Sequence, residues 1–113
     1  MLLVTEDSDL RAVVARVLRT EGYSVTAAAH SGHAILASMQ HAVFDVLVIE
    51  RRLADGRSRS IVERLRQWNP KVRTLRLCDS GGTSPTDLVR PFTADHLLAR
   101  LRALAPRPSA ARG

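Results

Sequence analysis

The chain has 113 residues, of which 45% are hydrophobic, so it is long enough for one globular domain and too apolar for a disordered segment. Its net charge is +6, a mild excess that does not by itself indicate nucleic-acid binding. No apolar run approaches the roughly 20 residues needed to span a bilayer, and the single cysteine excludes an internal disulfide. We therefore expect a cytoplasmic domain that does not contact a membrane.

Strand-like and helix-like segments alternate along the first half of the chain. Residues 1–5 and 23–29 are typical of strands, and residues 46–49 form an apolar, β-branched run that ends at Glu50 and is expected of a strand buried on both faces. Apolar residues at helical spacing predict one helix after the capping residues at 6–9 and a second at 31–40, capped by its first residue, a serine. The residues predicted to face inward from these two helices are Leu10, Val13, Val14, Val17, Leu18, Ile35, Leu36 and Met39.

The second half continues the alternation with one interruption. A third helix ends at Asn69-Pro70, strands follow at 71–78 and 87–89, and Thr93 caps a last helix. The loop at 79–86 is shorter than the dozen residues that a parallel crossover usually needs, so one helix is missing. Inward-facing residues are predicted at Ile61, Val62, Leu65, Trp68, Leu97, Leu98, Leu101 and Leu104. We assign residues 1–104 to one domain and residues 105–113 to a Pro/Ala/Arg-rich tail.

The missing helix has a consequence for the surface. Alternating strands and helices predict a parallel sheet that helices cover on both faces. Losing one helix should uncover apolar surface on the fourth and fifth strands, which a homodimer or a protein partner would then cover. Arg73 and Arg76 in the fourth strand also indicate that this strand is partly open to water.

Three segments resemble the receiver domain of bacterial response regulators: "LLVTEDSDLRAVVARVLRTEGYSV", "FDVLVIERRLADG" and "VRPFTADHLLARLRAL". The resemblance runs from about residue 1 to residue 104, with a gap where the helix is missing. It implies a flavodoxin-like (CheY-like), doubly wound α/β fold with a five-stranded parallel sheet in the order 2-1-3-4-5. The fourth helix of that fold would be missing or reduced to a loop here.

The resemblance places a phosphorylation site at the carboxyl ends of the strands, but its key residues differ. The family's third strand ends in an aspartate that accepts a phosphoryl group, whereas Glu50 stands at this position. The family holds Mg²⁺ with two acidic residues after the first strand, where this chain has Thr5 and Glu6, with Asp7 next to them. Glu6 and Glu50 still offer two carboxylates, and the backbone carbonyl of Arg52 a third ligand. We nevertheless expect no resident metal and no cofactor, because Thr5 is neutral.

Two further family positions also differ. A serine or threonine ends the family's fourth strand and a lysine precedes "PF", whereas this chain has Cys78 and Arg90. Glutamate is one methylene longer than aspartate, so we expect no phosphoryl transfer and assign no catalytic residue. Two interpretations stay open: a permanent Glu50–Arg90 ion pair that replaces the phosphate–lysine contact, or a site that has drifted. His30 and His33 have a spacing seen in metal sites but lack two further ligands.

The favoured function is an atypical receiver-like signalling module that acts by protein–protein interaction without aspartyl phosphorylation. The first alternative is an unconventional receiver that binds Mg²⁺ and is phosphorylated. The second is a nucleic-acid-associated regulator that uses the arginine-rich C-terminus, with Arg100, Arg102, Arg107 and Arg112. The chain has only four aromatic residues for base stacking, so we do not expect it to bind nucleic acid directly.

Overall fold

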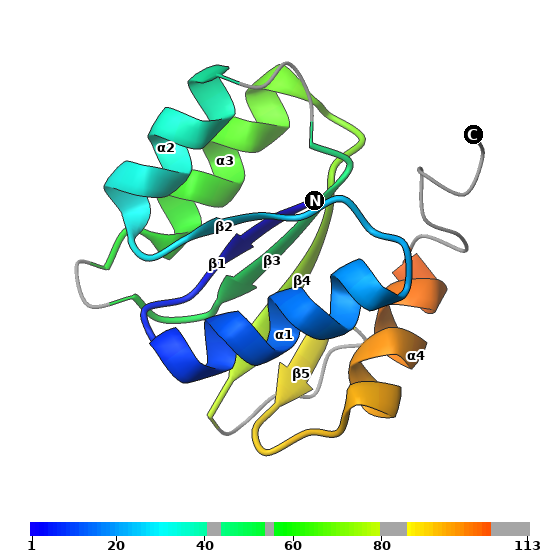
Figure 1. Cartoon of the computed structure of the whole chain (residues 1–113). Coiled ribbons are helices and arrows are strands. Elements are labelled where there is room, and N and C mark those ends of the chain that lie inside the picture. Colours follow the sequence, from blue (N-terminus) through cyan, green and yellow to red (C-terminus); the bar gives the residue numbers. More distant parts are fainter. Residues whose placement is uncertain (41–43, 54–55, 80–85, 105–113) are drawn as a thin grey trace.

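The structure, a computed structural model, describes residues 1–40, 44–53, 56–79 and 86–104. Its strands are β1 (Leu2–Val4), β2 (Thr26–Ala28), β3 (Val46–Glu50), β4 (Arg73–Cys78) and β5 (Asp87–Val89). Its helices are α1 (Ser8–Thr20), α2 (Ser31–Gln40), α3 (Ser58–Trp68) and α4 (Ala94–Leu104). All strand pairs are parallel, and the sheet order is β2-β1-β3-β4-β5, which confirms the predicted fold (Figure 1). The predicted tail, residues 105–113, lies outside the described residues.

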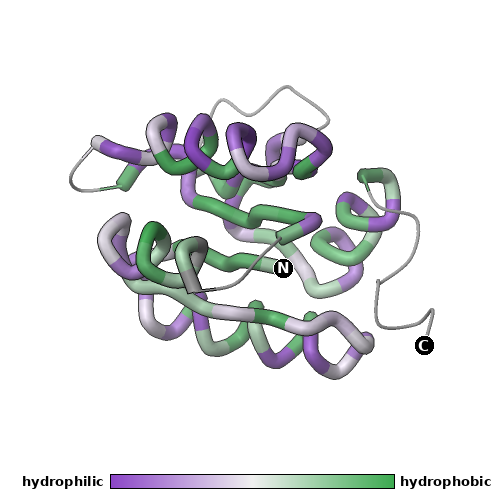
Figure 2. Tube along the Cα trace, turned by 90° about the horizontal axis from the view of Figure 1, so that it is seen from above, coloured by the Kyte–Doolittle hydropathy of each residue, from purple (hydrophilic) through white to green (hydrophobic). Residues whose placement is uncertain are grey.

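The sheet separates two apolar cores. Helices α1 and α4 cover one face and α2 and α3 the other, so the apolar strands lie between helical layers whose outer surfaces are more polar (Figure 2). The core under α1 and α4 is built around Leu3, Leu18, Val48, Leu75, Leu77, Leu88, Leu97 and Leu101. The core under α2 and α3 is built around Leu2, Val4, Ala34, Leu47, Ile49, Ile61 and Leu65. Strand β3 contributes to both cores, as expected for a central strand.

The predicted caps of the first and last helices are confirmed. The side chain of Asp7 accepts a hydrogen bond from the backbone N–H of Leu10 at 3.1 Å at the start of α1. The hydroxyl of Thr93 accepts one from the backbone N–H of His96 at 3.1 Å at the start of α4. Each cap satisfies one of the N–H groups that have no partner within the helix.

The predicted cap of α2 was wrong by one residue. Ser31 is the first residue of the helix, and the ring nitrogen Nδ1 of His30 accepts the hydrogen bond from the backbone N–H of His33 at 3.2 Å. The two imidazole rings are stacked with their centroids 4.5 Å apart. Helix capping therefore accounts for this histidine pair, and no group of three or more metal-ligating side chains is found within the described residues.

Four residues predicted to face inward are exposed instead. Their exposed fractions are 58% for Val13, 50% for Leu36, 68% for Met39 and 43% for Trp68. In α1, the buried stripe consists of Val14, Ala15 and Leu18. Helical spacing gives the approximate direction of a face, but the width of the buried stripe depends on how closely the neighbouring elements pack.

The edge of the sheet at β4 and β5 differs from the prediction. Leu75 and Leu88 are buried against α1 and α4, with exposed fractions of 0% and 2%. The expected uncovered apolar surface is therefore absent from the described residues here, because the side away from α4 carries Thr74, Arg76 and Asp87. No helix lies between β4 and β5 in the described part of the chain, where residues 80–85 are not included. Among the described helices, none is both long and apolar enough to cross a membrane.

Candidate functional site

The carboxyl ends of four parallel strands bring the predicted site residues together. Thr5 follows β1, Glu50 ends β3, Cys78 ends β4 and Arg90 follows β5. In an open parallel sheet, this edge is where ligands bind. Cys78 and Arg90 are joined through the backbone as well, since the N–H of Arg90 donates to the carbonyl of Cys78 at 2.8 Å.

The carboxylate of Glu50 is almost fully enclosed by hydrogen-bond donors. The residue is 8% exposed, and its Oε1 accepts a hydrogen bond from the hydroxyl of Thr5, which is completely buried. The same oxygen accepts a second bond from the backbone N–H of Glu6 at 2.8 Å. Its other oxygen, Oε2, accepts from the guanidinium of Arg90 at 2.8 Å. Both oxygens therefore have protein partners, as a buried carboxylate requires.

Arg90 connects this carboxylate to two more acidic side chains. Its guanidinium lies 2.8 Å from Glu50, 3.2 Å from Asp79 and 3.6 Å from Asp7. The Arg90 side chain is 24% exposed, whereas those of Asp79 and Asp7 are 85% and 48% exposed. The contact between Glu50 and Arg90 that the sequence suggested is thus present and better protected from solvent than the two outer contacts. Solvent screens the outer pairs and leaves the inner one as the main electrostatic interaction.

Two of the remaining predicted site residues, Arg52 and Cys78, line a small cavity beside this pair. The cavity has a volume of about 130 Å³, and Arg52 and Cys78 contribute to its wall together with Glu50 and Arg90. Cys78 is buried, and its thiol lies 3.8 Å from the backbone carbonyl of Arg76. Arg52 is exposed, and so is the predicted metal-pocket residue Glu6.

The residues at this edge do not fit the Mg²⁺ ion that the fold family implies. Mg²⁺ needs oxygen ligands in octahedral geometry, usually including carboxylates. Thr5 stands where a carboxylate would be needed, and its hydroxyl donates to Glu50. The guanidinium of Arg90 adds positive charge 2.8 Å from the Glu50 carboxylate, which opposes a dication at the same place.

The sequence did not reveal how two hydroxyl groups hold β3 in place. The hydroxyl of Ser58, the first residue of α3, donates to the backbone carbonyl of Glu50 at 2.6 Å. Sequence reasoning also missed the donation from Thr5 to the Glu50 side chain, because it considered Thr5 only as a position without a metal ligand. One signal for it was available: this chain has both an uncharged hydroxyl at the β1 end and a longer carboxylate at the β3 end, and the two ends lie next to each other in a parallel sheet.

Comparison with known proteins agrees with the fold. No protein-family model matches the chain. The chain is 31% identical over 117 residues to transcriptional regulatory protein TcrA of Mycobacterium tuberculosis, covering 95% of the chain and 46% of that protein. It is 34% identical over 119 residues to transcriptional regulatory protein TrcR of the same organism, covering 96% and 46%. The chain thus spans about half the length of these curated relatives.

Solved structures show the same architecture over almost the whole chain. Chemotaxis response regulator CheY4 of Vibrio cholerae superimposes with a TM-score of 0.77 at 26% identity, covering 91% of this chain and 95% of that one. The non-phosphorylated HemR receiver domain of Leptospira biflexa superimposes with a TM-score of 0.78 at 24% identity, covering 91% and 90%. The fold and strand order are thus those of a CheY-like receiver domain, and the structures that the chain resembles are receiver domains of response regulators.

Proposed function

We propose that this receiver domain signals through contact with a protein partner and without phosphorylation of the acceptor position. The observation that carries the proposal is the state of the Glu50 carboxylate, whose two oxygens are engaged by Thr5, Glu6 and Arg90. A carboxylate that attacks a phosphoryl group needs a free oxygen aligned with the leaving group. The hydrogen bonds from Thr5, Glu6 and Arg90 occupy the carboxylate lone pairs that such an attack would need.

Charge supports the same proposal. A phosphorylated receiver gains negative charge next to the cation that follows its fifth strand, and that gain is reversible. In this chain Glu50 supplies a permanent negative charge, held by Arg90 at 2.8 Å. We propose that the pair fixes one conformation of the site and that Thr5, Glu6, Asp7, Arg52 and Cys78 form the remnant of a metal and phosphate pocket around it.

The direct test is incubation with acetyl phosphate and Mg²⁺ followed by intact-mass measurement. The expected result is no gain of a phosphoryl group, either in the native chain or in Glu50→Asp, because the metal and donor positions stay altered. A conventional aspartate-containing receiver serves as the positive control. A stable phosphoryl gain that disappears in Glu50→Gln would favour the alternative, a phosphorylatable receiver that binds Mg²⁺.

The names of the relatives support a setting for this signalling role. Those from Mycobacterium tuberculosis are named transcriptional regulatory proteins, and response regulators act in two-component signal transduction. We propose that the chain works in such a pathway, in the cytoplasm, through a protein partner or through a homodimer. The nucleic-acid alternative rested partly on Arg107 and Arg112, which lie outside the described residues.

A further inference from the structure

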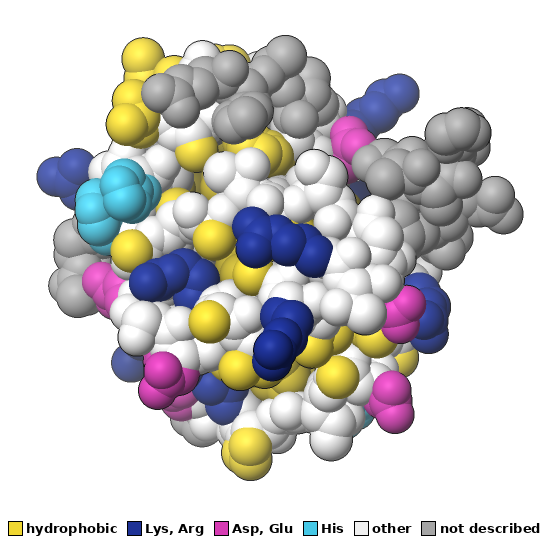
Figure 3. Space-filling view, in the orientation of Figure 1, with side chains coloured by type: hydrophobic (Ala, Val, Ile, Leu, Met, Phe, Trp, Pro, Cys, Tyr) yellow, Lys and Arg dark blue, Asp and Glu magenta, His cyan; other side chains and the backbone are white. Residues whose placement is uncertain are grey.

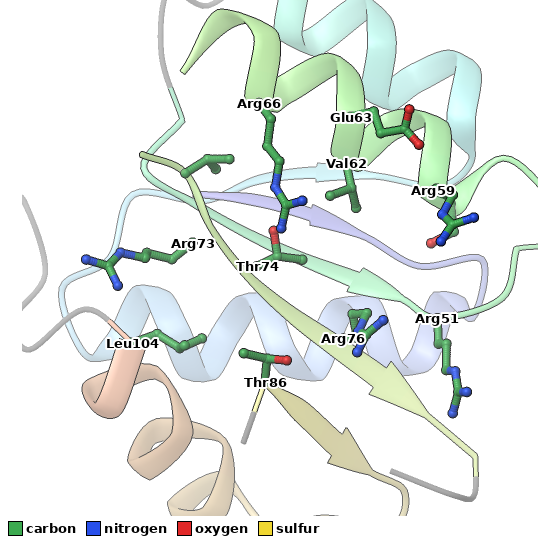
Figure 4. Close-up of a pocket in the computed structure, with 12 residues that line it drawn as sticks. Arg51, Arg59, Val62, Glu63, Arg66, Arg73, Thr74, Arg76, Thr86 and Leu104 are labelled. Carbon is green, nitrogen blue, oxygen red and sulfur yellow. The ribbon is translucent and has the colours of Figure 1, made fainter. Parts of the chain in front are cut away.

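A groove of about 760 Å³ lies where the missing helix would cover the sheet, between α3 and β4 (Figure 4). We call it the arginine groove, after the side chains that line it: Arg51, Arg59, Arg66, Arg73 and Arg76. Glu63 is the only acidic residue among its described lining residues. On the face that carries α1, by contrast, basic side chains are separated from one another by uncharged and hydrophobic ones, and acidic side chains lie toward the margins (Figure 3).

Most of the charge in the arginine groove is not neutralised. Arg76 is paired with the buried Asp87 at 2.9 Å. Within the described residues, no ion pair is found for the other four arginines of the groove, all of which are exposed. Arginine on an open surface is suited to carboxylate and phosphate groups, which it can bind with two parallel hydrogen bonds. An anionic ligand therefore suits this groove better than a second copy of this chain, whose net charge is +6.

The spacing of the arginines favours an elongated ligand over a single phosphate. Arg59 and Arg66 are seven residues apart on α3, so their Cα atoms lie about 10 Å apart along the helix axis. On β4, Arg76 is on the same side of the strand as Thr74, whereas Arg73, at the start of the strand, is three positions away and so on the opposite side, at one end of the groove lining. In Figure 4, Arg51 and Arg73 stand toward opposite ends of the lining. One compact anion cannot reach all of these groups.

The side chains of the lining also indicate which of two elongated anionic ligands, single-stranded nucleic acid or an acidic protein segment, suits the groove better. Single-stranded nucleic acid is bound by basic grooves in which aromatic side chains stack on the bases. The described lining has no aromatic side chain and instead has aliphatic groups, those of Val62, Val72 and Leu104. Arginines and aliphatic groups together are suited to a ligand that carries both carboxylates and apolar side chains. An acidic, amphipathic protein segment is such a ligand.

We infer that the arginine groove binds an acidic α-helix of a protein partner, laid along α3 in the place of the missing helix. A helix next to α3 presents carboxylates at i and i+7 with the same two-turn spacing as Arg59 and Arg66. It also covers the open side of β4, as parallel sheets generally require. This inference gives a surface and a partner class to the contact role proposed above, and it stands or fails independently of whether Glu50 accepts a phosphoryl group.

The test uses a defined probe and matched variants of the whole chain. The probe is a fluorescein-labelled peptide of about 15 residues, held helical by a lactam bridge, with glutamates at i, i+3 and i+7 on the opposite face. The control peptide has glutamine at those positions. The groove variant is Arg59→Glu plus Arg66→Glu, and the control variant is Arg16→Glu plus Arg64→Glu. These two control positions are exposed, lie on α1 and α3, do not line the groove, and change the net charge equally.

Fluorescence anisotropy should show the glutamate peptide binding in preference to the glutamine peptide. The groove variant should weaken binding at least about tenfold, and the control variant less than about threefold. Circular dichroism should show both variants folded.

An equal loss of peptide affinity in the groove variant and the control variant would mean that net charge alone attracts the peptide, and it would overturn the inference. So would absence of peptide binding, tighter binding of a 15-mer of deoxythymidine, or a dimer in sedimentation that only the groove variant dissociates. The phosphorylation test above separates a failure of the proposed function from a failure of this inference.

Discussion

Removing the guanidinium from the buried pair should measurably destabilise the domain. The Glu50 and Arg90 side chains are 11% and 24% exposed, so solvent screens them far less than a surface pair. Breaking a fully buried pair costs about 3–5 kcal/mol. In Arg90→Met the Glu50 carboxylate keeps its two other donors, from Thr5 and Glu6, so we expect a smaller loss, about 2 kcal/mol. For a domain of this size that corresponds to a melting temperature lower by about 8 °C.

A double-mutant cycle isolates the pair from the other contacts of Arg90. The cycle consists of Arg90→Met, Glu50→Gln and the two together, each measured by urea denaturation with circular dichroism. We expect a coupling energy of about 1.5 kcal/mol. The control cycle uses Arg102 and Glu21, which lie 3.9 Å apart with side chains 61% and 43% exposed and should couple by less than about 0.5 kcal/mol. Coupling energies that do not differ between the two cycles would refute a stabilising role for the buried pair.

Three further changes test the packing and the site. Thr5→Val keeps the shape but removes a donor to Glu50, so the free energy of unfolding should fall by about 1–2 kcal/mol, and an unchanged urea midpoint would contradict the hydrogen bond. Leu75→Asp places a charge in the covered core, so circular dichroism should show an unfolded chain, whereas Leu36→Asp, at a position 50% exposed, should stay folded. A folded Leu75→Asp protein would mean that this side of the strand faces solvent. Thr93→Ala removes the cap of α4 and should lower the unfolding free energy by about 1 kcal/mol, while a change within error would exclude the cap as a stabilising contact.

Local sequence determined the elements and their order. Strand β3 could be predicted because a strand buried on both faces reads as a continuous apolar run, here residues 46–49 before Glu50. The caps at Asp7 and Thr93 were predictable because they depend on residues only three positions away. The sheet order followed from resemblance to a known family, and the short connection between β4 and β5 already indicated that a helix was missing.

The tertiary structure decided which faces are covered and which polar groups meet. Leu36 and Met39 have helical spacing, yet they are exposed, because exposure depends on how neighbouring elements pack and not on periodicity. The uncovered side of β4 and β5 is polar because the leucines of both strands point toward α1 and α4, an orientation that the length of the loop does not determine. Thr5, Glu50 and Arg90 lie at least 40 positions apart in the sequence, and only the register of parallel strands brings their atoms into hydrogen-bonding distance.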